Sequence, residues 1–150
     1  ITGGMAAARA SLKTAIENNM AKVTGFPATV GVTPSATYAA TSATITNYID
    51  LVLASFDDAA TDNDKLAIIM KEYYLSTWGN GWEAYNAYRL TGYPKNMQPT
   101  VYSANPGFFV RSFYYPSVYV NRNLNAPAQK ALGIKAEKVF WDNNADNFIN

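Results

Sequence analysis

Residues 73–94 read YYLSTWGNGWEAYNAYRLTGYP, a stretch in which aromatic residues and glycines are interleaved with very little charge. On a helix, residues three or four apart share one face, which here would carry Tyr74, Trp78, Trp82, Tyr85 and Arg89. Gly92 can take the left-handed conformation that ends a helix, and Pro94 forbids its continuation. The stretch is therefore predicted to be helical, with Gly79 and Gly81 marking a kink or a close backbone approach.

The composition of the chain excludes several classes of protein. Its 150 residues are 49% apolar and 15% charged, which is typical of one folded domain and excludes a disordered chain. The net charge is +1 without a basic stripe, so neither nucleic-acid binding nor membrane-surface binding is expected. Cysteine and histidine are both absent, which excludes disulfides, thiolate nucleophiles, Ser-His-Asp triads and His- or Cys-ligated metals. No cofactor is predicted, and the apolar runs are far shorter than the about 20 residues of a membrane span.

Apolar periodicity predicts a mainly α-helical first part. A helix over 5–21 is expected from the spacing of Met5, Ala8, Leu12, Ile16 and Met20, closed by Gly25 and Pro27 and followed by a loop over 23–40. A second helix is expected over 42–56, with a stripe formed by Ile45, Ile49, Val52 and Phe56. Thr61 and Asp64 fit the capping box of a third helix that runs to about Leu90.

The last part of the chain, residues 95–150, is predicted to be rich in loops. Residues 95–110 have no regular pattern, and 111–125 are expected to hold a short extended piece limited by Pro116. A short helix is expected at about 126–132. The acidic turn that holds Asp57, Asp58, Asp62 and Asp64 lacks the spacing of a calcium loop, so helix capping is the favoured interpretation.

The aromatic face of 73–94 has two interpretations. Trp78 and Trp82 could be core residues, since large rings usually contribute to packing, or they could form a stacking platform for sugar rings. We favour the core. Glu83 could be the general acid of a carboxylate-dependent glycoside hydrolase or a buried structural acid paired with an arginine, and we favour the structural role with Arg111 as the partner.

The block GNGWEAYNAYRLTGYP at 79–94 resembles the G-x-G-x-E-A-x-N-x-x-R-x-T-G-Y-P signature of SusD/RagB-like proteins, specifically the second SusD-like subgroup. Arg111, Tyr115-Pro116 and Asn121 resemble the family's R…YP…N block, and 139–142 resemble its closing [VL]-[FW]-W-D. The resemblance spans nearly the whole chain and implies a helical fold with tetratricopeptide-like helix pairs. It also implies that residues 1–150 are the carboxy-terminal portion of a single SusD/RagB-like domain.

The resemblance implies a non-enzymatic protein that is lipid-anchored on the outer face of the outer membrane through a residue outside this chain. Such proteins capture glycans, and in some cases peptides, and pass them to a TonB-dependent SusC-like transporter. The rival functions are a helical protein-interaction scaffold and the Glu83-dependent hydrolase. The family motif implies a structural role for Trp78, Trp82, Glu83, Arg89, Gly92 and Arg111. Ligand contacts are expected in the loops, where the candidates are Tyr38, Tyr102 and Asn105.

Overall fold

The structure is a computed structural model that describes residues 4–95, 97–98, 111–130 and 138–145. These residues form α-helices and no β-strand, which confirms the prediction of a mainly α fold. The helices are α1 (Gly4–Thr29), α2 (Ser42–Asp58), α3 (Asp62–Ser76), α4 (Gly81–Thr91) and α5 (Ser117–Arg122). The chain divides into two compact units, Ile1–Gly79 and Asn80–Asn150.

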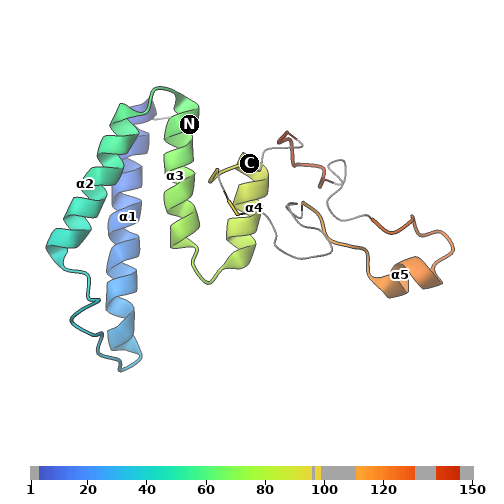
Figure 1. Cartoon of the computed structure of the whole chain (residues 1–150), viewed down its shortest axis with the longest axis horizontal. Coiled ribbons are helices and arrows are strands. Elements are labelled where there is room, and N and C mark those ends of the chain that lie inside the picture. The colour runs from blue at the N-terminus through green and yellow to red at the C-terminus, as the bar shows by residue number, and fades with distance from the viewer. Residues whose placement is uncertain (1–3, 96, 99–110, 131–137, 146–150) are drawn as a thin grey trace. The chain divides into compact units, whose positions relative to one another are not determined.

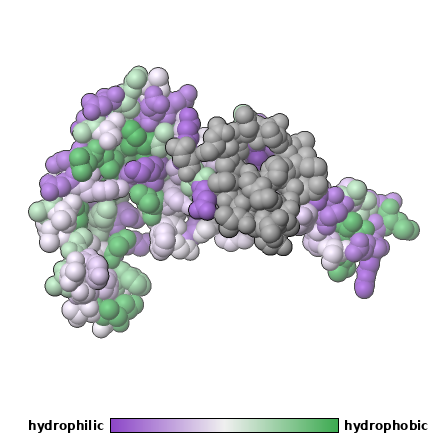
Figure 2. Space-filling model, viewed as in Figure 1, coloured by the Kyte–Doolittle hydropathy of each residue, from purple (hydrophilic) through white to green (hydrophobic). Residues whose placement is uncertain are grey.

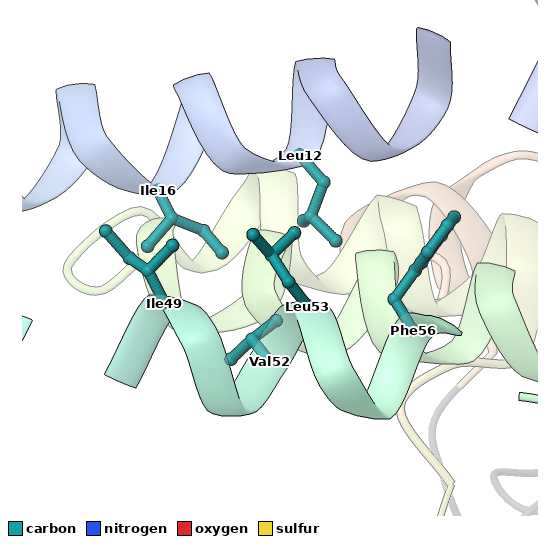
Figure 3. Close-up of a cluster of buried hydrophobic side chains, with 6 residues drawn as sticks. All are labelled: Leu12, Ile16, Ile49, Val52, Leu53 and Phe56. Atoms are coloured by element: carbon teal, nitrogen blue, oxygen red, sulfur yellow. The ribbon is translucent and has the colours of Figure 1, made fainter. Parts of the chain in front are cut away.

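The first unit is a bundle of α1, α2 and α3, in which consecutive helices run in alternating directions (Figure 1). Its core is formed where α1 packs on α2 (Figure 3), and its buried side chains are Leu12, Ile16, Ile49, Val52, Leu53 and Phe56. Ile68 and Ile69 of α3 are partly buried against this cluster. The stripes predicted from the period of three and four residues are therefore confirmed as the packing faces of α1 and α2, except for Met5, which is exposed.

Side-chain caps fix where α2 and α3 begin. Thr41 Oγ1 accepts a hydrogen bond from the Thr44 backbone N–H at 3.2 Å, and the Thr41 backbone N–H donates one to Thr44 Oγ1 at 2.9 Å. Thr61 caps α3 by accepting from the backbone N–H of Asp64 at 3.1 Å, as the sequence predicts. Each cap satisfies a backbone donor that a helix start would otherwise leave without an intrahelical partner.

A polar contact joins α2 to α3 beside the apolar core. The Tyr48 hydroxyl donates to Glu72 Oε2 at 2.6 Å, and Glu72 is buried. Burial raises the pKa of Tyr48 above its ordinary value, and the hydrogen bond to the Glu72 carboxylate raises it further. A buried carboxylate is costly without a donor, so this pair fixes the register of α2 on α3.

The first helix is longer than predicted, and the predicted loop at 23–40 is correspondingly shorter. α1 continues through Gly25 and Pro27 to Thr29, so the connection to α2 begins only at Val30. Pro27 lacks the N–H that would donate to the carbonyl four residues earlier. The end of α1 is exposed, so water can bond that carbonyl instead. The prediction that these two residues stop the helix was therefore wrong.

The predicted third helix is divided into two helices at the double-glycine segment. α3 ends at Ser76, and α4 begins at Gly81 after the N-cap residue Asn80. Gly79 has a φ of 87°, a left-handed conformation that suits glycine and interrupts the helical hydrogen bonding. The two glycines therefore mark a complete break, which is more than the predicted kink.

The second unit also differs from its predicted local structure. Within 111–125, residues 113–116 form neither helix nor strand, and Pro116 is directly followed by the short helix α5, which was not predicted. Proline is compatible with a helix start, where a backbone N–H has no intrahelical partner to lose. The helix expected at about 126–132 is not present over 126–130, and its last two residues lie outside the described ranges.

Candidate functional site

A highly connected group of polar side chains in the described part of the second unit is built on α4. The helix begins at the Asn80 cap and ends at Gly92, whose φ of 72° confirms the predicted left-handed stop. The Gly92 backbone N–H donates to the Tyr88 carbonyl at 2.7 Å, which closes the last turn. This termination places Arg89 in the last turn of α4, where a cation is favoured by the helix dipole.

Arg89 is buried and is held by both hydrogen bonds and aromatic rings. Its guanidinium donates to the Arg111 carbonyl at 2.9 Å and to Asn86 Oδ1 at 2.7 Å. Its Cζ lies 3.9 Å from the ring centroid of Tyr85 and 4.7 Å from that of Trp141. Stacking between aromatic faces compensates for part of the hydration that the buried cation has lost.

Arg111 forms a bidentate ion pair with Asp142. Its Nε donates to Oδ2 at 2.6 Å and its second terminal nitrogen donates to Oδ1 at 2.5 Å, with exposed side-chain fractions of 6% for Arg111 and 0% for Asp142. The same guanidinium donates to the carbonyls of Asn144 at 2.9 Å and Ala145 at 2.8 Å. The planar fork of arginine matches a carboxylate, so this geometry is both strong and specific.

The carboxyl group of Asp142 is held in its charged form. Burial by itself would raise the pKa of Asp142, but hydrogen bonds from Arg111 and from the Asn144 backbone N–H, together with the charge of Arg111, lower it below its ordinary value. The Asn144 side chain also donates to the Arg89 carbonyl and so links Asp142 to α4. We call Arg89, Arg111, Asp142 and Asn144 the arginine network.

The arginine network joins parts of the chain that are far apart in the sequence. The Arg89–Arg111 hydrogen bond spans 22 residues, the Arg111–Asp142 pair spans 31, and the Asn144–Arg89 bond spans 55. The hydrogen-bond partners named above for Arg89 and Arg111 are residues of the same chain. Backbone carbonyls accept hydrogen bonds from both guanidinium groups. The arrangement therefore acts as a clamp that fixes loops onto α4.

The proposed pairing of Glu83 with Arg111 requires correction. The carboxylate that binds Arg111 is that of Asp142, whereas Glu83 is exposed in the first turn of α4. The sequence contained the missing signal, because the closing block ends in Asp142 and a buried arginine needs a carboxylate. Spacing alone could not decide which acid would reach it.

The expectation that both indoles are core residues was wrong. The exposed fraction is 93% for Trp78 and 69% for Trp82. The prediction assumed one uninterrupted helix, but Trp78 lies in the turn between α3 and α4 and Trp82 lies in the first turn of α4. A residue outside the helix is not placed by helical periodicity, so the shared face does not exist.

Trp82 nevertheless has an aromatic neighbour. Its ring centroid lies 6.2 Å from that of Phe113 in an edge-on arrangement, and Phe113 lies 5.6 Å from Tyr85. These rings connect the start of α4 to the residues beside Arg111. Burial raises the pKa of Tyr85, and this effect exceeds the opposing influence of the Arg89 charge. The core side of α4 is therefore formed by Tyr88 and Arg89, which are buried, while its indole stays at the surface.

Of the residues proposed for ligand contact, the structure describes only Tyr38. Tyr38 is 88% exposed in the connection between α1 and α2, where its backbone N–H donates to the Ser35 carbonyl at 3.0 Å. The candidates Tyr102 and Asn105 lie outside the described residues. Tyr38 therefore has the accessibility that a contact residue requires, and its role stays a prediction.

The described surface offers few features of a catalytic or metal site. An open depression runs along α1 and is lined by small and neutral residues: Ala10, Ser11, Thr14, Ala15 and Asn18. Across the described ranges, histidine, cysteine and acidic side chains form no group of three that could hold a metal ion. Among the same residues, no helix has both the length and the apolar character needed to cross a membrane.

The family of the chain follows from comparison with known proteins. Residues 7–142 match the model of the SusD-like family, described as Susd and RagB outer membrane lipoprotein. The chain belongs to this family, whose members are non-catalytic binding proteins of the outer membrane. Searches of the curated proteins and of the solved structures each returned no match.

Proposed function

We propose that this chain is part of a cell-surface lipoprotein that captures glycans and delivers oligosaccharides to a TonB-dependent SusC-like transporter. The single observation that carries the proposal is the family match over residues 7–142. We further propose that residues 1–150 form the carboxy-terminal portion of a larger SusD-like domain. The lipid anchor then lies outside this chain, which has no cysteine to carry one.

The surface chemistry of the described residues supports capture by stacking. Several aromatic side chains are exposed, among them Tyr38, Trp78, Trp82 and Phe140. An exposed ring can pack against the C–H face of a sugar, while neighbouring polar groups bind its hydroxyls. Such contacts are shallow and give modest affinity, which suits a protein that has to release its cargo to a transporter.

The test is calorimetric titration of the full-length protein with a panel of neutral oligosaccharides. We expect at least one to bind, and we expect Tyr38→Ala to weaken that binding. Tyr38→Phe is the matched control, because it keeps the ring and removes only the hydroxyl. Copurification of a TonB-dependent barrel with the tagged protein tests delivery, as does the presence of its gene beside this one.

A second function, a helical protein-interaction scaffold, is favoured by one observation. Apolar side chains reach the surface near the end of α1 and in the loop that follows (Figure 2): Val23, Phe26, Val30 and Val32. The stretch from Val23 to Ile49 contains no charged residue. Failure to bind any glycan, together with tight binding to a purified protein partner, would favour this function over glycan capture.

The hydrolase hypothesis gains no support. Glu83 is exposed at a helix start, and the family consists of non-catalytic proteins. A glycosidase acid of this kind works in a buried setting with a second carboxylate at about 5–9.5 Å. Release of reducing ends from an oligosaccharide panel, abolished by Glu83→Gln, is the result that would revive it.

A further inference from the structure

The break between α3 and α4 contains the only Asn-Gly pair of the sequence, Asn80-Gly81. The backbone nitrogen that follows an asparagine can attack the side-chain amide carbon of that asparagine. A side chain on the following residue hinders this attack, and glycine has none. The pair therefore combines the most reactive neighbour with a position at the very start of α4, where Asn80 is the N-cap and Gly81 the first helical residue.

The local structure leaves the Asn80 amide accessible and weakly held. Asn80 is exposed, and its Oδ1 accepts the Glu83 backbone N–H at 3.4 Å. This distance lies beyond the usual N–H···O range, and it is longer than the 3.1 and 3.2 Å bonds of the threonine caps of α2 and α3. A long cap bond leaves the amide free to turn toward the Gly81 nitrogen.

The Gly81 side of the pair is equally open. A Cβ built on Gly81 would meet no atom within 4 Å, and Gly79, the residue before Asn80, is in the left-handed conformation and likewise has open space where a Cβ would stand. Both glycines of this turn therefore have open space on the side where a side chain would stand. Asn80 itself has a φ of −114° and a ψ of 76°, which lie outside the helical region.

We propose that Asn80 is a site of spontaneous deamidation, an inference that does not depend on the proposed function. The deprotonated Gly81 nitrogen forms a bond to Cγ of Asn80, the bond between Cγ and Nδ2 breaks, and ammonia leaves after taking a proton from solvent. The product is a cyclic succinimide. Water then adds to one of its two carbonyls and opens the ring, which yields aspartate or isoaspartate. The net reaction consumes one water and releases one ammonia without any redox change.

The two products have opposite effects on α4. Aspartate keeps a capping oxygen and adds a negative charge at the helix start, where the dipole favours it. Isoaspartate routes the backbone through the former side chain and displaces the cap from Glu83. Because α4 carries Arg89, the isoaspartate product weakens the helix on which the arginine network is built.

The experiment is incubation of the folded chain at neutral and mildly alkaline pH, followed by peptide mapping with mass spectrometry. Trypsin cleaves after Lys71 and Arg89, so one peptide holds both Asn80 and Asn86. Asn86 is an internal control, since it lies within α4 and is followed by alanine. We expect aspartate and isoaspartate to accumulate at position 80, at a rate proportional to hydroxide concentration, while Asn86 stays intact.

Gly81→Ala is the matched variant, because there is room for its methyl group and alanine favours the helix. It should abolish the accumulation over the same incubation while leaving the circular dichroism spectrum unchanged. Two results would overturn the proposal. In one, the Gly81→Ala variant deamidates at position 80 as fast as the parent. In the other, Asn80 of the parent reacts in urea but stays intact in the folded chain.

Discussion

Replacing Asp142 by asparagine tests whether the arginine network holds the second unit together. The change preserves size and shape but removes the charge and turns an amide N–H toward the guanidinium of Arg111. The ion pair is bidentate at 2.5 and 2.6 Å, and the Asp142 side chain is fully buried. Solvent therefore cannot replace the lost carboxylate.

Removal of one partner of a buried ion pair typically costs about 3–5 kcal/mol, because the other charge stays buried without compensation. Arg111 keeps its bonds to the carbonyls of Asn144 and Ala145, so we expect a loss near the lower end, about 3 kcal/mol. The free energy of unfolding is measured in urea from the fluorescence of Trp141, next to the substituted residue, with the exposed Trp78 and Trp82 replaced by phenylalanine.

Asp57→Asn is the matched control, since it makes the same chemical change in the bidentate pair of Asp57 with Arg9. That pair is exposed, with side-chain fractions of 41% for Arg9 and 48% for Asp57, so its loss should be much smaller. If Asp142→Asn lowers the free energy of unfolding no more than Asp57→Asn does, the clamp role assigned to the network is wrong.

The pH dependence of the same pair gives an independent check. The pKa of Asp142 is lowered in the folded chain, so its contribution to stability is complete above the unfolded carboxyl pKa of about 3.9. That contribution is lost as the pH falls further, through the folded pKa. The parent chain should therefore lose more stability than Asp142→Asn when the pH is lowered below about 4.

Three further substitutions test other parts of the structure. Tyr48→Phe leaves the buried Glu72 carboxylate without its donor and should cost about 1–3 kcal/mol in urea unfolding, whereas Tyr48→Phe with Glu72→Leu should cost less than the two single changes added together. Because the pKa of Tyr48 is raised in the folded chain, the stability that its hydroxyl contributes is lost only at alkaline pH, above the ordinary tyrosine pKa of about 10. If Tyr48→Phe unfolds at the same alkaline pH as the parent chain, this pH dependence is not due to Tyr48. Gly92→Ala places a side chain in the left-handed conformation at the end of α4 and should cost about 1–2 kcal/mol, while the same substitution at Gly81 should not destabilise. Trp78→Ala should change the free energy of unfolding by less than about 0.5 kcal/mol, since its indole is exposed; a loss of several kcal/mol would restore the original core assignment.

Structural features that depend only on residues close together in the sequence could be predicted from the sequence alone. The stripe on 42–56 predicted both α2 and its buried face, and Thr61 and Gly92 marked a helix start and a helix end that the structure confirms. Each of these signals acts within about one helical turn, through side-chain period, a capping hydrogen bond or a backbone dihedral preference. The family signature at 79–94 likewise needed no coordinates.

Only the tertiary structure decided two kinds of feature: contacts between residues far apart in the sequence, and the ends of helices where small opposing free energies nearly cancel. The sequence reasoning paired Arg111 with Glu83, and only folding shows that Asp142, 31 residues away, reaches it. The exposure of Trp78 follows from the break at Gly79, where modest glycine penalties compete with helix continuation and periodicity cannot predict the outcome. Pairing of buried charges is set by where the chain brings them, which no local spacing encodes.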